Sequence, residues 1–222
     1  MDCRQFCLPP PLSREVISRF EEVGGGDLYQ EKASRYWDAL REYFSLKLLA
    51  EVPPATEDTR PDRKQMVTSL ISEVWGGSLD NASCVDCCCG SGVIAEAIRE
   101  CGGQPCGYDN DPTLIALGLQ SRRLHPHQVM HIDALRATDY IAPATYGVGC
   151  MLGGDITAFN AGMWADIVFE LLALSEQTLI TTATEPEIRR VEEWAVAEGR
   201  TCEIRENERD PIYDRWVCIA SV

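Results

Sequence analysis

Hydrophobic residues change their spacing along the chain at about residue 77. Before this point they recur at intervals of three and four, the spacing of one face of a helix. The pattern predicts helices over residues 12–22, 28–50 and 62–75, and a proline-punctuated loop separates the last two. Residues 1–80 are therefore expected to form a helical segment, and residues 81–222 a domain of different architecture.

Beyond residue 80, short apolar runs alternate with amphipathic segments. Strands are predicted over residues 83–88, 106–109, 129–133, 147–152 and 178–183, with a closing pair over 202–206 and 216–222. Helices are predicted between them, over residues 93–101, 112–123, 162–175 and 186–198. Placing the fourth strand at 166–169 instead is rejected, because it leaves no helix before residue 178. The alternation predicts an α/β fold with a doubly wound sheet.

Composition and charge narrow the class of protein. The 222 residues carry 35 acidic and 20 basic side chains, which give a formal charge of −15. Such a surface repels phosphate, so a nucleic-acid partner is disfavoured. The chain has no run of 18 apolar residues and no signal-peptide pattern at its N-terminus, so a cytoplasmic protein without a membrane segment is expected. The oligomeric state is left open.

Eleven cysteines are present, three of them consecutive at Cys87–Cys89. Without an export signal they are expected to be reduced thiols in the core rather than disulfides. Cys84 and Cys87 have the spacing of half a zinc site, but residues three apart on a strand point to opposite faces. The three histidines between residues 125 and 131 lack a completing carboxylate or thiol, so no metal site is expected.

Residues 84–111 carry the pattern that points to chemistry. A strand, a tight glycine turn, a helix and a second strand ending in an acid follow one another, which is a nucleotide-binding βαβ unit. Gly90 and Gly92 let the backbone pass close to a ligand. Asp109, at the end of the second strand, is placed to accept both hydroxyl groups of a ribose.

Two cofactor classes share this geometry. Residues 90–95 also fit the Gly-x-Gly-x-x-Ala fingerprint of dinucleotide-binding proteins. Asp86, at the end of the first strand, separates the two classes, because its carboxylate would repel a pyrophosphate and attract a cation. S-adenosylmethionine carries a sulfonium and an ammonium group and no phosphate, so the charge of Asp86 favours it over NAD. The alternative is that Asp86 only caps the turn.

Residues 84–92, Cys-Val-Asp-Cys-Cys-Cys-Gly-Ser-Gly, resemble the first motif of the class I S-adenosylmethionine-dependent methyltransferases, with Cys88 where the family most often has glycine. Gly107–Asp111 is similar to the second motif, and residues 131–135 are similar to the third. The resemblance extends from about residue 28 to the C-terminus and includes the closing strand pair. It implies a Rossmann-like, mostly parallel sheet with an antiparallel last strand, and S-adenosylmethionine as the cofactor.

The resemblance also implies roles for individual residues. Asp109 would bind the ribose, Asp133 the adenine amino group, and the backbone amide of Ala134 the adenine ring. The cofactor-binding set that it implies comprises Asp86, Cys88, Gly90, Gly92, Asp109, Asn110, Asp133 and Ala134, with Tyr29 and Tyr36 from an N-terminal helix that lies over the cofactor.

The loop after the predicted fourth strand lies beside the transferable methyl group in this family. Residues 147–160 contain no Asn-Pro-Pro-Tyr or Asp-Pro-Pro-Tyr, which in the family accompany methylation of planar amine nitrogens in bases or glutamine. Asp155, Thr157 and Asn160 are candidates for the substrate side, and Tyr36 for the wall of the substrate pocket. Helix capping by Asn160 and plain loop polarity explain the three loop residues equally well.

The hypothesis that follows is methyl transfer from S-adenosylmethionine to a small molecule or a protein side chain. Two alternatives stay open. One is an NAD(P)-binding oxidoreductase, which Asp86 and the closing strand pair disfavour. The other is a methyltransferase-like partner subunit without catalytic activity. No residue indicates which atom of the acceptor is methylated, and no catalytic residue is assigned.

Overall fold

The computed structural model describes residues 18, 21–22, 24, 31–56, 60–154 and 156–222. They divide into two units, residues 1–40 and 41–222, each of which is described by itself. Helix α2 (Ala33–Glu51) begins in the first unit and continues in the second. The helix predicted over residues 12–22 lies outside the described residues, except for residues 18, 21 and 22, which are helical.

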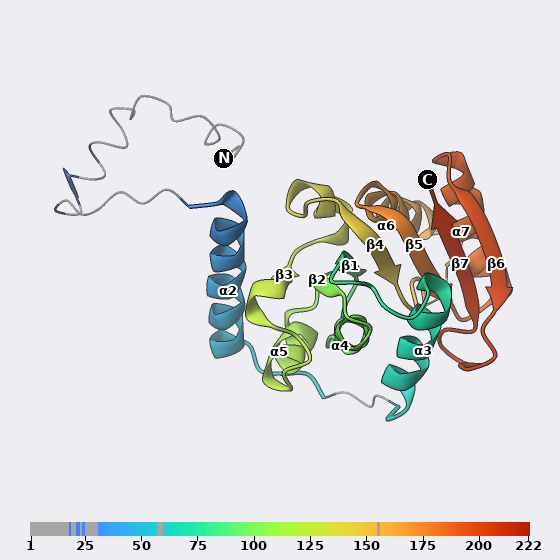
Figure 1. The fold of residues 1–222 in the computed structure, drawn as a ribbon, viewed down its shortest axis with the longest axis horizontal. Helices are drawn as coiled ribbons and strands as arrows, with labels where there is room; N and C mark the ends of the chain where they lie inside the picture. Colours follow the sequence, from blue (N-terminus) through green and yellow to red (C-terminus); the bar gives the residue numbers. More distant parts are fainter. Residues whose placement is uncertain (1–17, 19–20, 23, 25–30, 57–59, 155) are drawn as a thin grey trace. The chain divides into compact units, whose positions relative to one another are not determined.

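The second unit is built on a seven-stranded sheet with the strand order β3-β2-β1-β4-β5-β7-β6 (Figure 1). The strands are β1 (Ser83–Cys87), β2 (Gln104–Asp109), β3 (Val129–His131), β4 (Ala144–Gly149), β5 (Ser175–Thr182), β6 (Thr201–Glu206) and β7 (Trp216–Ser221). Strands β1 to β5 pair in parallel, and β7 is antiparallel to both β5 and β6. The predicted α/β sheet with an antiparallel last strand is confirmed.

Helices cover both faces of this sheet (Figure 1). They are α3 (Arg63–Trp75), α4 (Val93–Glu100), α5 (Pro112–Gln120), α6 (Ala161–Ala173) and α7 (Glu185–Ala197), with the 3-10 helices η2 (Pro126–Gln128) and η3 (Ala134–Asp139). Cys84 packs in the core beneath α3 and α4, whereas Cys87 packs in the core beneath α6 and α7. The two thiols therefore lie on opposite faces, as the alternation along a strand predicts. Among the described helices, none is long and apolar enough to cross a membrane.

A third apolar cluster holds the second part of α2 against α5 and β3. Leu48 and Leu49 of α2 pack against buried residues of α5 and β3, among them Ile115 and Val129. The buried hydroxyl of Ser45 donates a hydrogen bond to the carbonyl of Val129 at 3.2 Å. This polar contact satisfies a buried hydroxyl and fixes the rotation of α2 about its axis.

Strand β4 begins and ends earlier than predicted. It spans Ala144–Gly149 rather than residues 147–152, and the rejected alternative at 166–169 lies within α6. The strand ends because the chain turns at Met151, where φ is 56°, and Leu152 then enters the core. The amide of Met151 donates to the hydroxyl of Thr181 at 2.8 Å, and that of Leu152 to the Thr181 carbonyl at 3.0 Å. Burial of Leu152 gave this turn the apolar pattern of a strand.

The remaining boundaries differ by a few residues for local reasons. β3 ends at His131 rather than residue 133, because the carboxylate of Asp133 accepts the amide of Leu135 and begins η3. Helix α5 ends at Gln120 rather than residue 123, ahead of Arg122, where φ is 62°. Such end effects depend on single side chains and carry little periodic signal.

Gly118 of α5 allows that helix to approach the loop after β1. A Cβ atom at this position would lie 2.7 Å from the carbonyl oxygen of Ser91 and 2.5 Å from the side chain of Leu124. Both distances are shorter than a carbon atom can approach another atom without overlap, and the Ser91 carbonyl oxygen belongs to the backbone. The absence of a side chain at Gly118 therefore sets the distance between α5 and the loop.

We expect Gly118→Ala to lower the free energy of unfolding by about 1–3 kcal/mol, because the added methyl group overpacks the contact with the loop. Gly162→Ala is the matched control, since a Cβ atom on this glycine of α6 would meet nothing within 4 Å. Alanine there should raise stability by about 0.5 kcal/mol through helix propensity. Urea denaturation measures both values, and equal effects of the two substitutions would contradict the packing argument.

Candidate functional site

The carboxyl ends of β1 and β4 mark the place where this sheet can receive a ligand. β2 and β3 follow on one side of β1, and β4 and β5 follow on the other, so the winding reverses between β1 and β4. In open α/β sheets, the loops that leave the two strands diverge at such a point, and ligands bind in the crevice between them. The glycine motif directly follows β1 and therefore lies at this edge.

The loop after β1 turns through three left-handed residues. The angle φ is 55° at Cys88, 50° at Gly90 and 83° at Gly92. A Cβ atom on Gly92 would lie 2.5 Å from the side chain of Leu124, so packing requires glycine there. A Cβ atom on Gly90 would meet nothing closer than Leu114, at 3.9 Å. The backbone at Gly90 is thus open to a ligand, whereas Gly92 serves the packing of the loop.

The carboxylate of Asp109 ties the glycine loop to the end of β2. Its Oδ2 accepts a hydrogen bond from the amide of Gly90 at 2.8 Å, and its Oδ1 accepts one from the amide of Asp111 at 2.8 Å. The residue is 8% exposed. Each oxygen keeps a further lone pair for another donor. Asp109 therefore holds the loop in place and is able to accept two hydroxyl groups as well.

Asp86 is the most unusual acid in the site. It is fully buried, and no described side chain donates a hydrogen bond to either carboxyl oxygen. Burial, followed by the negative charge of Asp109, raises the pKa of Asp86 to about 8. The backbone amide of Ala95 and, to a smaller extent, the positive charges of Arg63 and Arg99 oppose this shift without cancelling it. The carboxyl group is therefore mostly protonated at neutral pH, and a cation beside it would stabilise the ionised form.

The buried thiols of Cys87 and Cys89 add no negative charge beside Asp86. Burial raises the pKa of the Cys89 thiol well above its usual range. Hydrogen bonding to the thiol of Cys88, followed by burial, does the same for the pKa of Cys87. In the part of the chain that the structure describes, no three His, Cys, Asp or Glu side chains are arranged to hold a metal ion.

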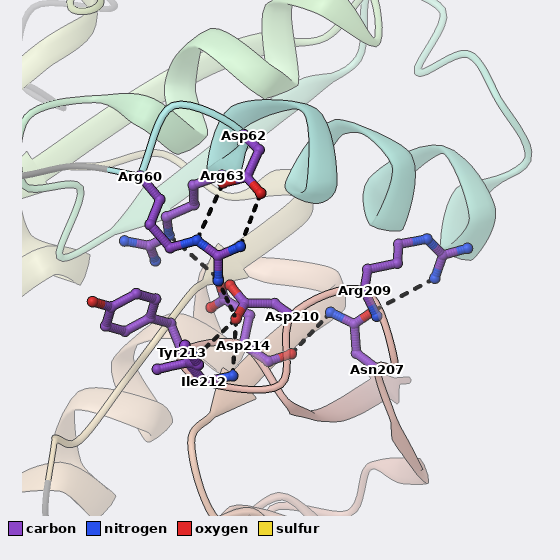
Figure 2. A network of polar contacts seen from close by, with 9 residues as sticks. All are labelled: Arg60, Asp62, Arg63, Asn207, Arg209, Asp210, Ile212, Tyr213 and Asp214. Carbon is purple, nitrogen blue, oxygen red and sulfur yellow. Dashed lines mark hydrogen bonds and ion pairs between the residues drawn. The ribbon is translucent and has the colours of Figure 1, made fainter.

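A polar network at the carboxyl ends of β4 and β5 was not predicted from the sequence. It joins the beginning of α3 to the loop between β6 and β7 (Figure 2). Asp214 is 1% exposed and accepts hydrogen bonds from Arg63 Nε at 3.3 Å and from the hydroxyl of Thr181 at 2.5 Å. The same hydroxyl accepts the amide of Met151. The network therefore connects α3 to the turn after β4, which borders the crevice.

The other half of the network surrounds Asp210, which is also 1% exposed. Its Oδ1 accepts the amides of Ile212 and Tyr213 at 3.0 Å each and faces Arg60 Nη1 at 3.6 Å. Sequence reasoning missed these residues because the partners are as far as 151 positions apart, as Arg63 and Asp214 are, and no periodic spacing links them. The only local signal was a pair of aspartates in the turn-rich segment before β7.

The residues predicted to bind the adenine end lie at the carboxyl ends of β2 and β3. The carbonyl of Asn110 lies 3.2 Å from Nε2 of His131, which links the two loops. Asp133 is exposed, and its carboxylate accepts the amide of Leu135 at 3.0 Å, while Ala134 is buried. The topology brings these residues to the same edge of the sheet as Asp109, and their contact with adenine stays a prediction.

The residues predicted for the substrate side have local partners or lie outside the described residues. Asn160 precedes α6 as its N-cap residue, but its side chain makes no capping hydrogen bond. Its Oδ1 accepts the amide of Thr157 at 2.7 Å and the Thr157 hydroxyl at 3.1 Å. Asp155 and Tyr29 lie outside the described residues. Tyr36 belongs to the first unit, where its ring is 56% exposed.

Comparison with known proteins identifies the fold. No family model matches the chain, and no curated protein matches its sequence. A magnesium protoporphyrin IX methyltransferase from Synechocystis PCC 6803, solved with bound S-adenosylmethionine, is 12% identical and has a TM-score of 0.58, covering 88% of this chain and 100% of that one. A precorrin-6y C5,15-methyltransferase from Geobacter metallireducens is 11% identical with a TM-score of 0.51, covering 77% and 94%. A proposed RNA methyltransferase from Pyrococcus horikoshii is 13% identical with a TM-score of 0.52, covering 81% and 94%. The chain has the Rossmann-like fold of the class I methyltransferases.

The left-handed backbone conformation of Cys88 costs free energy that glycine at this position would not lose. A non-glycine residue in the left-handed region costs about 1–2 kcal/mol, part of which the greater freedom of glycine in the unfolded chain offsets. We expect Cys88→Gly to raise the free energy of unfolding by about 0.5 kcal/mol. Cys106→Gly, the same change in the extended strand β2, should lower it by about 1 kcal/mol. A loss of stability in Cys88→Gly, measured by urea denaturation, would contradict this account.

Asp86 should make the stability of the protein depend on pH. The unfolded chain releases this proton near its ordinary pKa of about 4, whereas the folded protein holds it to about pH 8. The stabilising contribution of Asp86 is therefore complete below about pH 4 and is lost as the pH rises to about 8. We expect the melting temperature of Asp86→Asn to fall less between pH 5 and pH 8 than that of the wild type. Asp139→Asn, at an exposed carboxylate paired with Arg136, should keep the wild-type slope.

Proposed function

We propose that the protein transfers a methyl group from S-adenosylmethionine to a small molecule or a protein side chain. The observation that carries this proposal is the buried carboxyl group of Asp86, without a side-chain partner among the described residues, at the reversal point of a methyltransferase-type sheet. A cation placed there would stabilise the ionised form of this carboxyl group, whereas the pyrophosphate of NAD would be repelled by it. The antiparallel strand β7 also speaks against a dinucleotide-binding oxidoreductase.

The residues around the crevice fit S-adenosylmethionine in charge and in shape. Asp109 has lone pairs available for the two ribose hydroxyl groups, and the bare backbone of Gly90 leaves room for the ligand above the loop. Asp86 supplies negative charge on the side of the sulfonium and ammonium groups. We assign the adenine end to Asp133 and the amide of Ala134, and a covering role to residues 1–80, including Tyr29 and Tyr36.

When bound, S-adenosylmethionine supplies an electrophilic methyl group. The task of the chain is then to align the acceptor in line with the sulfonium and to exclude water. The turn after β4 borders the place of transfer, and Thr181 holds its amides at Met151 and Leu152 in a single conformation. A general base is required only if the acceptor arrives protonated. The proposal therefore assigns no acid–base residue.

The acceptor is proposed from charge rather than from fold. The structural neighbours are named for tetrapyrrole and RNA substrates, so the fold itself is compatible with both. The net charge of −15 disfavours a polyanion, which supports a small molecule or a protein side chain. We also propose a cytoplasmic location, which suits a chain in which several cysteines pack as small apolar side chains in the core.

Binding of S-adenosylmethionine, S-adenosylhomocysteine and NADH to the purified chain, measured by calorimetry, tests the cofactor. We expect the wild type to bind the first two and not NADH. Asp109→Ala should weaken binding at least tenfold, since it removes both ribose acceptors, while Asp139→Asn should leave affinity within about twofold of wild type. Circular dichroism verifies that Asp109→Ala stays folded. Binding of NADH alone would favour an oxidoreductase, and binding of none of the three would favour a partner subunit.

A further inference from the structure

Arg63, the first residue of α3, has hydrogen-bonding capacity that the described residues do not use. Its side chain is 18% exposed. Its Nε donates to Asp214, and its guanidinium lies 5.7 Å from the centre of the Tyr213 ring. Its two terminal nitrogens have no hydrogen-bond partner among the described residues. In Figure 2 they point away from Asp214, on the side of the Tyr213 ring.

Arg60 lies three residues earlier and provides an internal contrast. Its Nε and one terminal nitrogen donate to Asp62 at 3.1 Å and 2.8 Å, and its other terminal nitrogen faces Asp210 at 3.6 Å. Every nitrogen of Arg60 therefore has an acidic neighbour. The two arginines belong to the same polar network, yet only Arg63 has two terminal nitrogens without a partner among the described residues. We call these two nitrogens its open fork. The terminal nitrogens of Arg63 are not among the buried, unpartnered atoms of the described residues, so they reach solvent and are accessible to a ligand.

The position of Arg63 places this fork beside the crevice. Asp214, its partner, is hydrogen-bonded through Thr181 to the turn after β4. Arg63 also lies close enough to Asp86 to lower the pKa of that acid. Arg63 is therefore near the acid proposed for the cofactor and is linked to the turn proposed to border the acceptor.

The surroundings indicate the chemistry of the missing partner. A guanidinium fork matches the two oxygens of a planar anion. The buried carboxylate of Asp214 contacts Arg63 and would repel a doubly charged phosphate more strongly than a singly charged group. The ring of Tyr213 adds apolar surface next to the fork. Together these features fit a carboxylate.

We propose that Arg63 and Tyr213 form a carboxylate-binding subsite at the carboxyl ends of β4 and β5. The proposal rests on the methyl-transfer function above. Two sources supply the same chemistry: the amino-acid carboxylate of the cofactor, and a carboxylate carried by the acceptor. The test is arranged so that its arms separate them.

The experiment uses three variants of the full chain. Arg63→Lys keeps the charge and removes the fork. Arg63→Gln/Asp214→Asn removes the arginine together with its acidic partner, so that no buried carboxylate is left unpaired. Arg60→Gln is the matched control, because it removes a charge from the same helix start at a fork that the protein already fills. Thermal melts verify that each variant is folded.

The first arm compares S-adenosylhomocysteine with 5′-methylthioadenosine, which has the same nucleoside and lacks the amino acid. If the subsite binds the cofactor carboxylate, both Arg63 variants weaken the binding of S-adenosylhomocysteine at least tenfold and change that of 5′-methylthioadenosine less than twofold.

The second arm measures the binding of benzoate and of benzamide in the presence of saturating 5′-methylthioadenosine. If the subsite binds the acceptor carboxylate, wild type binds benzoate and not benzamide, and the Arg63 variants lose benzoate while keeping S-adenosylhomocysteine. Arg60→Gln should resemble wild type in both arms.

The proposal is overturned if the Arg63 variants bind every probe as wild type does, or if they weaken S-adenosylhomocysteine and 5′-methylthioadenosine equally. Failure of the proposed function has a different signature, because wild type then binds neither nucleoside. In that event benzoate, offered alone, still decides the subsite: selective binding over benzamide that depends on Arg63 supports it, and its absence overturns it.

Discussion

The two hydrogen bonds of the Asp109 carboxylate support most of the candidate site. One oxygen holds the amide of Gly90 and the other the amide of Asp111. Asp111 in turn accepts the amides of Thr113 and Leu114 and begins α5. Helix α5 returns to the loop after β1 through Gly118, whose bare backbone fits against that loop. The contacts form a closed circuit, so a ligand that engages Asp109 meets a loop already held in its binding conformation, which lowers the entropic cost of binding.

On the other side of the crevice, three buried aspartates determine the local charge. Asp86, Asp210 and Asp214 are all nearly inaccessible to solvent. Arg60, just before α3, and Arg63, its first residue, provide the nearby positive charge, and Asp214 has both an arginine and a hydroxyl partner. Asp86 obtains neither, so it keeps its proton in the ligand-free protein. A carboxyl group whose pKa is shifted this far is typical of functional sites, because a cationic ligand beside it would favour its ionised form.

Sequence reasoning succeeded where the signal is local and periodic. The βαβ unit from β1 to β2 was predicted because its strand, glycine turn, helix and acid lie within about thirty consecutive residues, and each has a distinctive residue type. It failed at β4, where Leu152 is buried after a turn and continues an apolar run that is not a strand. It also missed Arg63 and Asp214, because an ion pair between distant segments leaves no periodic pattern in either of them.

The sequence by itself determined the succession of strands and helices along the chain, the glycine motif and the acids at the ends of the first two strands, since these depend on local periodicity and on backbone sterics. Only the tertiary structure decided the state of those residues. It buried Asp86 without a side-chain partner. It left the backbone of Gly90 open and used Gly92 for packing. It also left the terminal nitrogens of Arg63, but not those of Arg60, without a partner among the described residues. Burial and charge balance are sums over residues that the fold brings together from distant parts of the chain, so no local stretch of sequence contains them.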